Sequence, residues 1–344
     1  MSQFIFTLLL LIPIILYFIR GTRIEIVMAV LIAVVLSLIC GLRDFDSGID
    51  TPHYVYFLEL ISEGKSEYVY GVEETFKKIS ELLMYINDSP TFVFLICSFI
   101  TNILIFITFI KYRSYASISV MVLVYLCDFY MHTFNIMRQM CGVAIVFYGF
   151  YYLFNKRLLK FVIGVIAAMS FHLSACISLI AVALDFSHLK KRKFLLFSII
   201  SCIAILSYIL IPRLKSGYLH YFDDIQLNLG FGLLIKLVFF IISFVLLVYK
   251  RKIKQESLLR RQFLSISMLY FVGIVLSFFG YFYPNMQRIG FYFLIFETVF
   301  YGMVFTNLKT NNIANFCFKA FIIFMQIYIF IVSITNNSMG IFST

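Results

Sequence analysis

The chain has 344 residues, of which 62% are hydrophobic and 13% are charged, and it carries a formal net charge of +11. A soluble domain is nearer half apolar, so this composition excludes a soluble enzyme. Apolar runs of about 20 residues recur from end to end, which predicts an all-α, polytopic integral membrane protein. The basic residues lie in short clusters between these runs, so they set membrane orientation, and we expect no nucleic-acid partner.

Residues 1–344 are interpreted as a single membrane domain with about ten transmembrane helices. The first apolar run is followed at once by Arg20 and Arg23, which is typical of a first transmembrane helix rather than a signal peptide. The seven cysteines form no CxxC pair, which indicates neither a disulfide framework nor a zinc site. The predicted spans are 3–19, 24–40, 91–110, 116–133, 135–154, 194–211, 231–249, 263–282, 288–306 and 315–335.

The segment 41–90, which follows the second span, carries many more acidic than basic residues. Basic clusters such as 111–113 and 156–160 are expected on the cytoplasmic side, which leaves 41–90 outside the cytoplasm. Within this segment, residues 54–63 and 73–86 show helical apolar spacing mixed with charge. We therefore expect two amphipathic helices that lie on the outer surface.

Residues 161–184 are long enough to cross the membrane once, but one crossing would place a basic cluster on the outer side. We therefore predict a broken helical pair, 161–171 and 173–184, that enters and leaves on the cytoplasmic side. His172 would lie at the tip of this pair, at mid-membrane depth or somewhat beyond. A full eleventh crossing is the alternative.

Three arginines fall at the outer ends of predicted spans: Arg43, Arg138 and Arg288. The positive-inside bias opposes this placement, and a charge inside the bilayer is costly. Arginine offers a planar fork of donors that suits phosphate and stays charged in any surroundings. The pattern predicts a clamp for a phosphate or pyrophosphate at headgroup level. The alternative for each arginine is that its side chain extends to the interface.

Other polar residues in the spans are candidates of lower rank. Glu297 lies inside a predicted span, which is a functional hypothesis by default, with no partner visible from sequence. Asp128 and His132 are four residues apart and would share one helical face. The "DFD" at 44–46 is similar to the D-x-D that holds a metal in nucleotide-sugar transferases. Nucleotide sugars are cytoplasmic and this segment faces outward, so we expect no metal and no cofactor.

Four stretches carry a family resemblance. "GLRDFDSGIDTPHYVYF" (41–57), "VEETF" (72–76), the block 135–175 with "NIMRQ" and "FHLSA", and "QRIGFYF" (287–293) resemble, in order, motifs of the EpsG family. That family comprises bacterial surface-polysaccharide polymerases of Wzy type. Its E-P-x-F element has Glu74 in place of Pro here, so Glu73 or Glu74 fills the acidic position. Glu73 matches by its spacing to Phe76.

The resemblance implies a membrane fold of GT-C type and a glycosyltransferase of the bacterial inner membrane, with its active site on the periplasmic side. Such an enzyme moves the growing glycan from one lipid diphosphate to the non-reducing end of an incoming undecaprenyl-diphosphate-linked repeat unit. The implied partners are this lipid-linked oligosaccharide, the lipid bilayer and a chain-length regulator.

The expected chemistry needs stabilisation of the departing diphosphate and a base for the acceptor hydroxyl. We predict that Arg138 and Arg288 hold the diphosphate, with Arg43 as a third donor. Candidate bases are Glu73, Asp50 and His172. Asp50 can instead be a turn-forming residue, and His172 can instead cap exposed backbone at the helix break. From the family motifs, Tyr54, Gln139 and Tyr292 are expected to bind substrate. The amphipathic helices expected at 54–63 and 73–86 could frame a groove for the acceptor, and their tyrosines suit either sugar stacking or the aromatic belt of the membrane interface, of which the belt is commoner.

Two other functions use a similar substrate. A flippase or other transporter of lipid-linked oligosaccharides would show repeat symmetry and polar residues across the whole membrane. No repeat is visible, and the costly charges cluster near one face. An O-antigen ligase-like transferase shares the leaving group, so only the order of the motifs favours the polymerase.

Overall fold

The structure, a computed structural model, describes residues 3–68, 71–183, 231–248, 258–280, 284–308, 312–336 and 340–341. Within these ranges the chain is all-helical, which confirms the predicted class of a polytopic membrane protein. The predicted span 194–211 lies outside the described residues. Five helices in the described part are long and apolar enough to cross a membrane: Arg23–Gly41, Pro90–Tyr112, Gln262–Phe279, Arg288–Asn307 and Ile313–Thr335.

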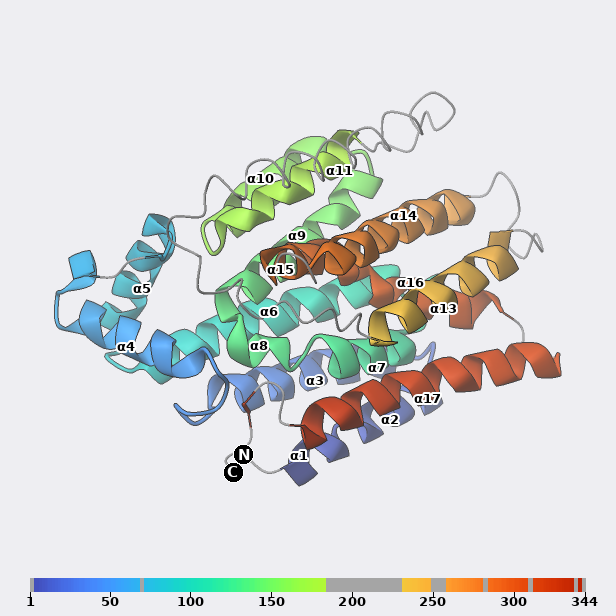
Figure 1. The fold of residues 1–344 in the computed structure, drawn as a ribbon, viewed down its shortest axis with the longest axis horizontal. Coiled ribbons are helices and arrows are strands. Elements are labelled where there is room, and N and C mark those ends of the chain that lie inside the picture. The colour runs from blue at the N-terminus through green and yellow to red at the C-terminus, as the bar shows by residue number, and fades with distance from the viewer. Residues whose placement is uncertain are drawn as a thin grey trace.

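Most helices run side by side along the long axis of the molecule, and two short ones cover one end (Figure 1). The helices are α1 (Gln3–Leu8), α2 (Leu11–Phe18), α3 (Arg23–Gly41), α4 (Thr51–Ser62), η1 (Ser66–Tyr68), α5 (Glu74–Ile86), α6 (Pro90–Tyr112), α7 (Ile118–Asp128), α8 (His132–Asn135), α9 (Met137–Phe154), α10 (Leu158–Met169), η2 (Leu173–Leu179), α11 (Ile180–Ala183), α13 (Phe231–Val248), α14 (Leu258–Phe279), α15 (Pro284–Leu294), α16 (Phe296–Asn307) and α17 (Ile313–Thr335).

Local sequence explains where the long helices begin. The Thr22 side chain accepts the backbone N–H of Glu25, which is a free donor in the first turn of α3, and the Glu25 carboxylate accepts the N–H of Gly21, just before the helix. Pro90 occupies the first turn of α6, where its missing N–H costs nothing. These signals set the residue at which each helix begins, while the length of each apolar run sets how many residues the helix contains.

The centre of the bundle differs from its periphery. Every residue of α7 from Ile118 to Cys127 is buried, and α16 packs against α7. The outer helices expose large apolar side chains, including Leu31 on α3, Ile163 on α10 and Phe324 on α17. An outward apolar surface is costly in water but matches hydrocarbon, so these faces indicate contact with lipid.

Helices α4 and α5 form the two amphipathic elements predicted in the segment 41–90. They lie together at one end of the bundle (Figure 1). On α5, Phe76 and Met84 are buried while Tyr85 is 90% exposed, so the helix has one packed face and one open face. The Phe57 and Phe76 rings stack at 6.0 Å and join α4 to α5.

The predicted break in the segment 161–184 is present. Helix α10 ends at Met169, the chain turns at residues 170–172, and η2 with α11 then packs back against α10 (Figure 1). The turn is held to α5, because Thr75 donates to the Ser170 carbonyl at 3.1 Å. The tip therefore reaches the same end of the bundle as α4 and α5.

One predicted span is wrong in detail. The run 116–133 is not one helix, because α7 ends at Asp128 and a turn at residues 129–131 precedes the short α8. The turn is closed by backbone bonds in which the N–H groups of Phe129 and Tyr130 both reach the Tyr125 carbonyl. Asp128 and His132 therefore do not share a helical face, contrary to the prediction.

Candidate functional site

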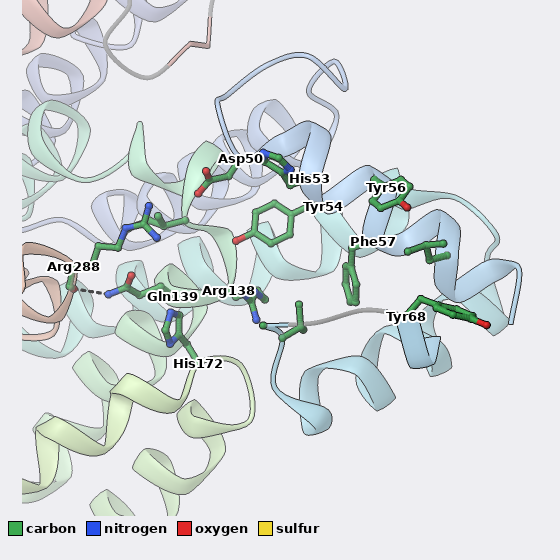
Figure 2. Close-up of a pocket in the computed structure, with 14 residues that line it drawn as sticks. Asp50, His53, Tyr54, Tyr56, Phe57, Tyr68, Arg138, Gln139, His172 and Arg288 are labelled. Carbon is green, nitrogen blue, oxygen red and sulfur yellow. Dashed lines mark hydrogen bonds between the residues drawn. The ribbon is translucent and has the colours of Figure 1, made fainter. Parts of the chain in front are cut away.

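A pocket of about 340 Å³ opens where α4, the start of α9, the turn at 170–172 and α15 meet. Figure 2 shows that polar side chains from all four elements face it. It combines residues from the segment 41–90 with residues from late in the chain. The lining residues are Asp50, His53, Tyr54, Tyr56, Phe57, Leu60, Tyr68, Gly71, Val72, Ile136, Arg138, Gln139, His172 and Arg288.

Arg138 is positioned by an ion pair and two rings. Its guanidinium donates to the carboxylate of Glu73, at the N-terminal boundary of α5. The guanidinium carbon lies 5.6 Å from the centre of the Phe76 ring and 5.9 Å from that of Tyr54. The buried Nε has no hydrogen-bond partner within the described part of the chain. Arg138 therefore keeps donor capacity beside the pocket.

Glu73 connects three segments with one carboxylate. One oxygen pairs with Arg138, and the other accepts the backbone N–H of Leu173 at 2.9 Å and lies 3.4 Å from Nδ1 of His172. Both oxygens are thus engaged, which leaves little capacity to take a proton from a substrate. The geometry favours a positioning role for Glu73 over that of the base.

His172 lies in the turn after α10, where its Nδ1 accepts the backbone N–H of Ser174 at 3.4 Å. Burial lowers the pKa of His172, partly opposed by Glu73 and reinforced by Arg138 and Arg288. The lowered pKa of His172 favours the neutral form of its ring at pH 7. His172 caps a backbone group and lines the pocket at the same time.

Arg288 reaches the pocket from α15. The side-chain amide of Gln139 donates to the Arg288 backbone carbonyl, which ties α9 to α15, and Gln139 is 1% exposed. The Arg288 guanidinium points into the pocket, toward the side where Asp50 and the Tyr54 hydroxyl lie (Figure 2). Arg138 and Arg288, far apart in sequence, thus face one hollow.

Asp50 and Tyr54 come from the start of α4. Asp50 stands at the N-cap position, yet its side chain makes no capping bond. Within the described residues its carboxylate has no hydrogen bond or ion pair, and it faces the pocket (Figure 2). Tyr54 lies one turn later; burial raises the pKa of its hydroxyl, while Arg138 acts in the opposite direction.

Two expected substrate-binding residues do not line the pocket. Arg43 is 3% exposed; it donates to the Cys40 carbonyl at 3.3 Å and lies 4.3 Å over the Phe94 ring. It thus caps the end of α3 and is not among the residues that line the hollow, so the expectation that it forms a third phosphate donor gains no geometric support. Tyr292 is fully buried, with its hydroxyl accepting from Ser174 at 3.2 Å, so it supports the turn that carries His172.

The sequence pattern of the EpsG family matches residues 26–343, nearly the whole chain. The chain belongs to the EpsG family. Members of this family are Wzy-like polysaccharide polymerases, so the protein is a membrane polysaccharide polymerase at the family level. No curated protein and no solved structure matches the chain.

In this EpsG-family chain, the residues at one end of the pocket are not among the site residues that the sequence predicts one by one. They are His53, Tyr56, Phe57 and Tyr68, of which Tyr56 belongs to the tyrosines expected to suit sugar stacking or the membrane interface. The repeated aromatics of "YVYF" were visible, but tyrosine is also common at membrane interfaces. Which rings face a hollow depends on the packing of α4 against η1 and residues 71–72, and that packing is tertiary.

A second polar cluster lies among the helices, outside the pocket. Lys236 of α13 pairs with Glu297 at 2.7 Å and with Asp128 at 3.1 Å, and Gln326 of α17 donates to Glu297 at 3.2 Å. The Glu297 side chain is fully buried and that of Asp128 is 5% exposed. Glu297 thus has the partner that sequence could not name. His132 packs edge-on against Phe291 instead of pairing with Asp128.

Proposed function

We propose that this EpsG-family protein is a polymerase of undecaprenyl-diphosphate-linked glycans at the periplasmic face of the bacterial inner membrane. It transfers the growing glycan from one lipid diphosphate to the non-reducing end of an incoming lipid-linked repeat unit. The observation that carries this proposal is that Arg138 and Arg288 face one pocket together with Asp50, Tyr54, Gln139 and His172.

The two arginines hold the diphosphate. A diphosphate leaving group gains negative charge as the bond to the sugar breaks, and fixed guanidinium groups stabilise that charge in a partly dry site. Arg138 uses part of its guanidinium on Glu73, and its side chain lines the pocket. Glu73 holds the Arg138 guanidinium and Gln139 holds the backbone carbonyl of Arg288, so Arg138 and the helix that carries Arg288 are positioned before substrate arrives.

Asp50 is the base in this proposal. The acceptor hydroxyl gives its proton to Asp50 as its oxygen bonds to the anomeric carbon of the donor sugar. The bond from that carbon to the phosphate oxygen breaks, and its electron pair leaves with the lipid diphosphate. Asp50 is favoured over Glu73 because its carboxylate is uncommitted within the described residues. His172 and Glu73 serve to hold Arg138 and the 170–172 turn.

The distribution of charge supports the periplasmic side. Arg138 is near the start of α9, whose 18 residues rise about 27 Å, and Arg157 lies just beyond its far end. In Figure 1 the α9–α10 turn lies at the end of the bundle opposite α4 and α5. Basic residues favour the cytoplasmic side, so the pocket end would face outward.

The proposal is tested by deleting the gene and separating surface polysaccharide on a gel. One repeat unit on the lipid core is expected, since unpolymerised units can still be ligated. Long chains in the deletion strain, or no repeat unit at all, would contradict the proposal; the second result would indicate a flippase or a ligase.

Complementation then tests the arginines. Arg138→Ala is expected to restore the protein to the membrane but not the long chains. Arg138→Lys should also fail, because a point charge replaces a fork of donors. Arg157→Ala is the matched control, since Arg157 is exposed at the other end of α9. If the strain that carries Arg138→Ala makes chains of normal length, Arg138 is not needed to hold the diphosphate.

A further inference from the structure

The pocket has two chemically different ends. Beyond the polar residues around Arg138 and Arg288, it continues along α4 to a wall of aromatic rings (Figure 2). We call this wall the aromatic end and define it as Tyr56, Phe57 and Tyr68. Leu60, Gly71 and Val72 line the pocket near these rings.

The rings of the aromatic end differ in how firmly they are held. Phe57 is 5% exposed and stacks on Phe76, whose ring in turn lies under the Arg138 guanidinium. Tyr56 and Tyr68 are 64% and 59% exposed, from α4 and η1. In the aromatic end, Phe57 is thus held in place by Phe76, the same ring that contacts Arg138. The rings of Tyr56 and Tyr68 remain accessible.

We propose that the aromatic end is a saccharide subsite, which holds sugar rings of one lipid-linked glycan. The diphosphate that lies between Arg138 and Arg288 belongs either to that same glycan or to the second lipid-linked substrate. This inference rests on the proposed function and names where the glycan lies. The C–H faces of sugars pack on aromatic rings, and tyrosine adds a hydroxyl that can bond to sugar hydroxyls at low entropic cost.

The lining of the pocket favours a saccharide over a lipid chain. His53, Tyr54, Tyr56 and Tyr68, all of which carry polar groups, are distributed along it, and an alkyl chain offers no hydrogen bond to any of those groups. A tyrosine that only marks the membrane interface needs no pocket: Tyr85 on α5 is 90% exposed and lies outside this lining. Tyr85 is therefore a natural control for Tyr68.

The absence of tryptophan from the sequence allows a direct binding test. Tyr68→Trp and Tyr85→Trp each give a protein with a single tryptophan, which is reconstituted in nanodiscs of phosphatidylethanolamine and phosphatidylglycerol. The probe is the phosphate-free repeat-unit oligosaccharide, released by hydrolysis from the surface polysaccharide of the same bacterium. A saturable change of fluorescence is expected for Tyr68→Trp and none for Tyr85→Trp. The absence of a saturable change in Tyr68→Trp, or an equal change in both, overturns the subsite.

Kinetic measurements with each of the two lipid-linked substrates show which of them places its sugar rings in the aromatic end. Tyr68→Ala should raise KM for one substrate about tenfold, the size of a well-packed aromatic contact, with kcat little changed. A rise for the repeat unit assigns the subsite to the acceptor, and a rise for the polymer-bearing lipid assigns it to the growing chain. Tyr68→Phe keeps the ring and should recover most of the loss. Unchanged KM for both substrates in Tyr68→Ala overturns the proposal.

The failure of this inference can be told from the failure of the proposed function. Arg288→Ala in the Tyr68→Trp background should abolish polymer while the phosphate-free oligosaccharide still changes the fluorescence, because that probe carries no phosphate. If gene deletion leaves long chains but the oligosaccharide still binds, the function is wrong and the subsite stands. If deletion leaves a single repeat unit but the probe does not bind, the function stands and the subsite is wrong.

Discussion

The Glu73 carboxylate pairs with the Arg138 guanidinium and at the same time accepts the backbone N–H of Leu173. The ion pair therefore links the start of α5, the start of α9 and the turn that carries His172. Both side chains are largely buried, so the pair is screened little by solvent. One contact thus sets the position of the Arg138 guanidinium relative to the 170–172 turn beside the pocket.

Glu73→Gln keeps an acceptor for Leu173 but removes the charge beside Arg138. We expect normal protein abundance and at least a tenfold loss of polymerisation, because the guanidinium is no longer held in place. Glu73→Ala should also lower the free energy of unfolding by about 1–3 kcal/mol, since the Leu173 N–H loses its partner. Polymer on gels and thermal unfolding in detergent measure the two effects.

The matched control is Glu74→Gln, because the Glu74 side chain is 77% exposed and, within the described residues, forms an ion pair only with Lys77. It should leave polymer length unchanged. A larger loss from Glu74→Gln than from Glu73→Gln would show that Glu74 fills the family's acidic position.

The stability that His172 contributes to the folded protein is expected to depend on pH. Burial and the charges of Arg138 and Arg288 lower its pKa in the folded state, against the opposing charge of Glu73. Its unfolded value is near 6.5, so the unfolded chain binds this proton more readily. The contribution of neutral His172 to stability is therefore full above about pH 6.5 and is lost as the pH falls through the folded value.

Thermal unfolding of the wild type and of His172→Asn, measured from pH 8 downward, checks this sign. The difference in Tm should be constant above about pH 6.5 and should shift against the wild type in acid. A wild type that gains stability relative to the variant in acid would mean that the Glu73 ion pair outweighs burial.

Gly48 is a position where only glycine fits. Its φ is +99°, and an added Cβ would lie 2.7 Å from Oδ1 of Asn135 and 3.0 Å from the Phe134 carbonyl. Gly48→Ala should destabilise the protein by more than about 2 kcal/mol and displace the turn that carries Asp50, with loss of polymer.

Gly64→Ala is the control for backbone strain alone. Gly64 also has a positive φ, of +71°, but nothing lies within 4 Å of an added Cβ. It should cost about 1 kcal/mol in thermal unfolding and leave polymerisation intact. Equal effects of the two substitutions would show that strain, rather than contact with α8, dominates at Gly48.

Lys236 is expected to matter for stability. Lys236→Met leaves Glu297 and Asp128 buried without their cation, so we expect a loss of about 3–5 kcal/mol and low abundance in the membrane. Combining it with Glu297→Gln and Asp128→Asn removes the unpaired charges and should restore abundance and polymer. A single Lys236→Met protein as stable as the wild type would contradict a structural role for the cluster.

The sequence by itself determined the membrane class, the positions of most helices and the break at 170–172. These features follow from the length of apolar runs, the placement of basic clusters and short-range capping, all of which are local. Arg138, Arg288 and His172 were also visible as charged or polar residues whose cost in a membrane demands a reason, and Asp50 was visible through the family motif that contains it.

Only the tertiary structure decided which of these residues share a hollow. Arg43 looked equivalent to Arg138 along the chain, yet its side chain folds back on Cys40 and Phe94. The partner of Glu297 came from α13, and the aromatic end of the pocket formed from α4 and η1. Sequence spacing fixes neighbours on one helix, whereas contacts between helices depend on how their faces pack, which no local pattern records.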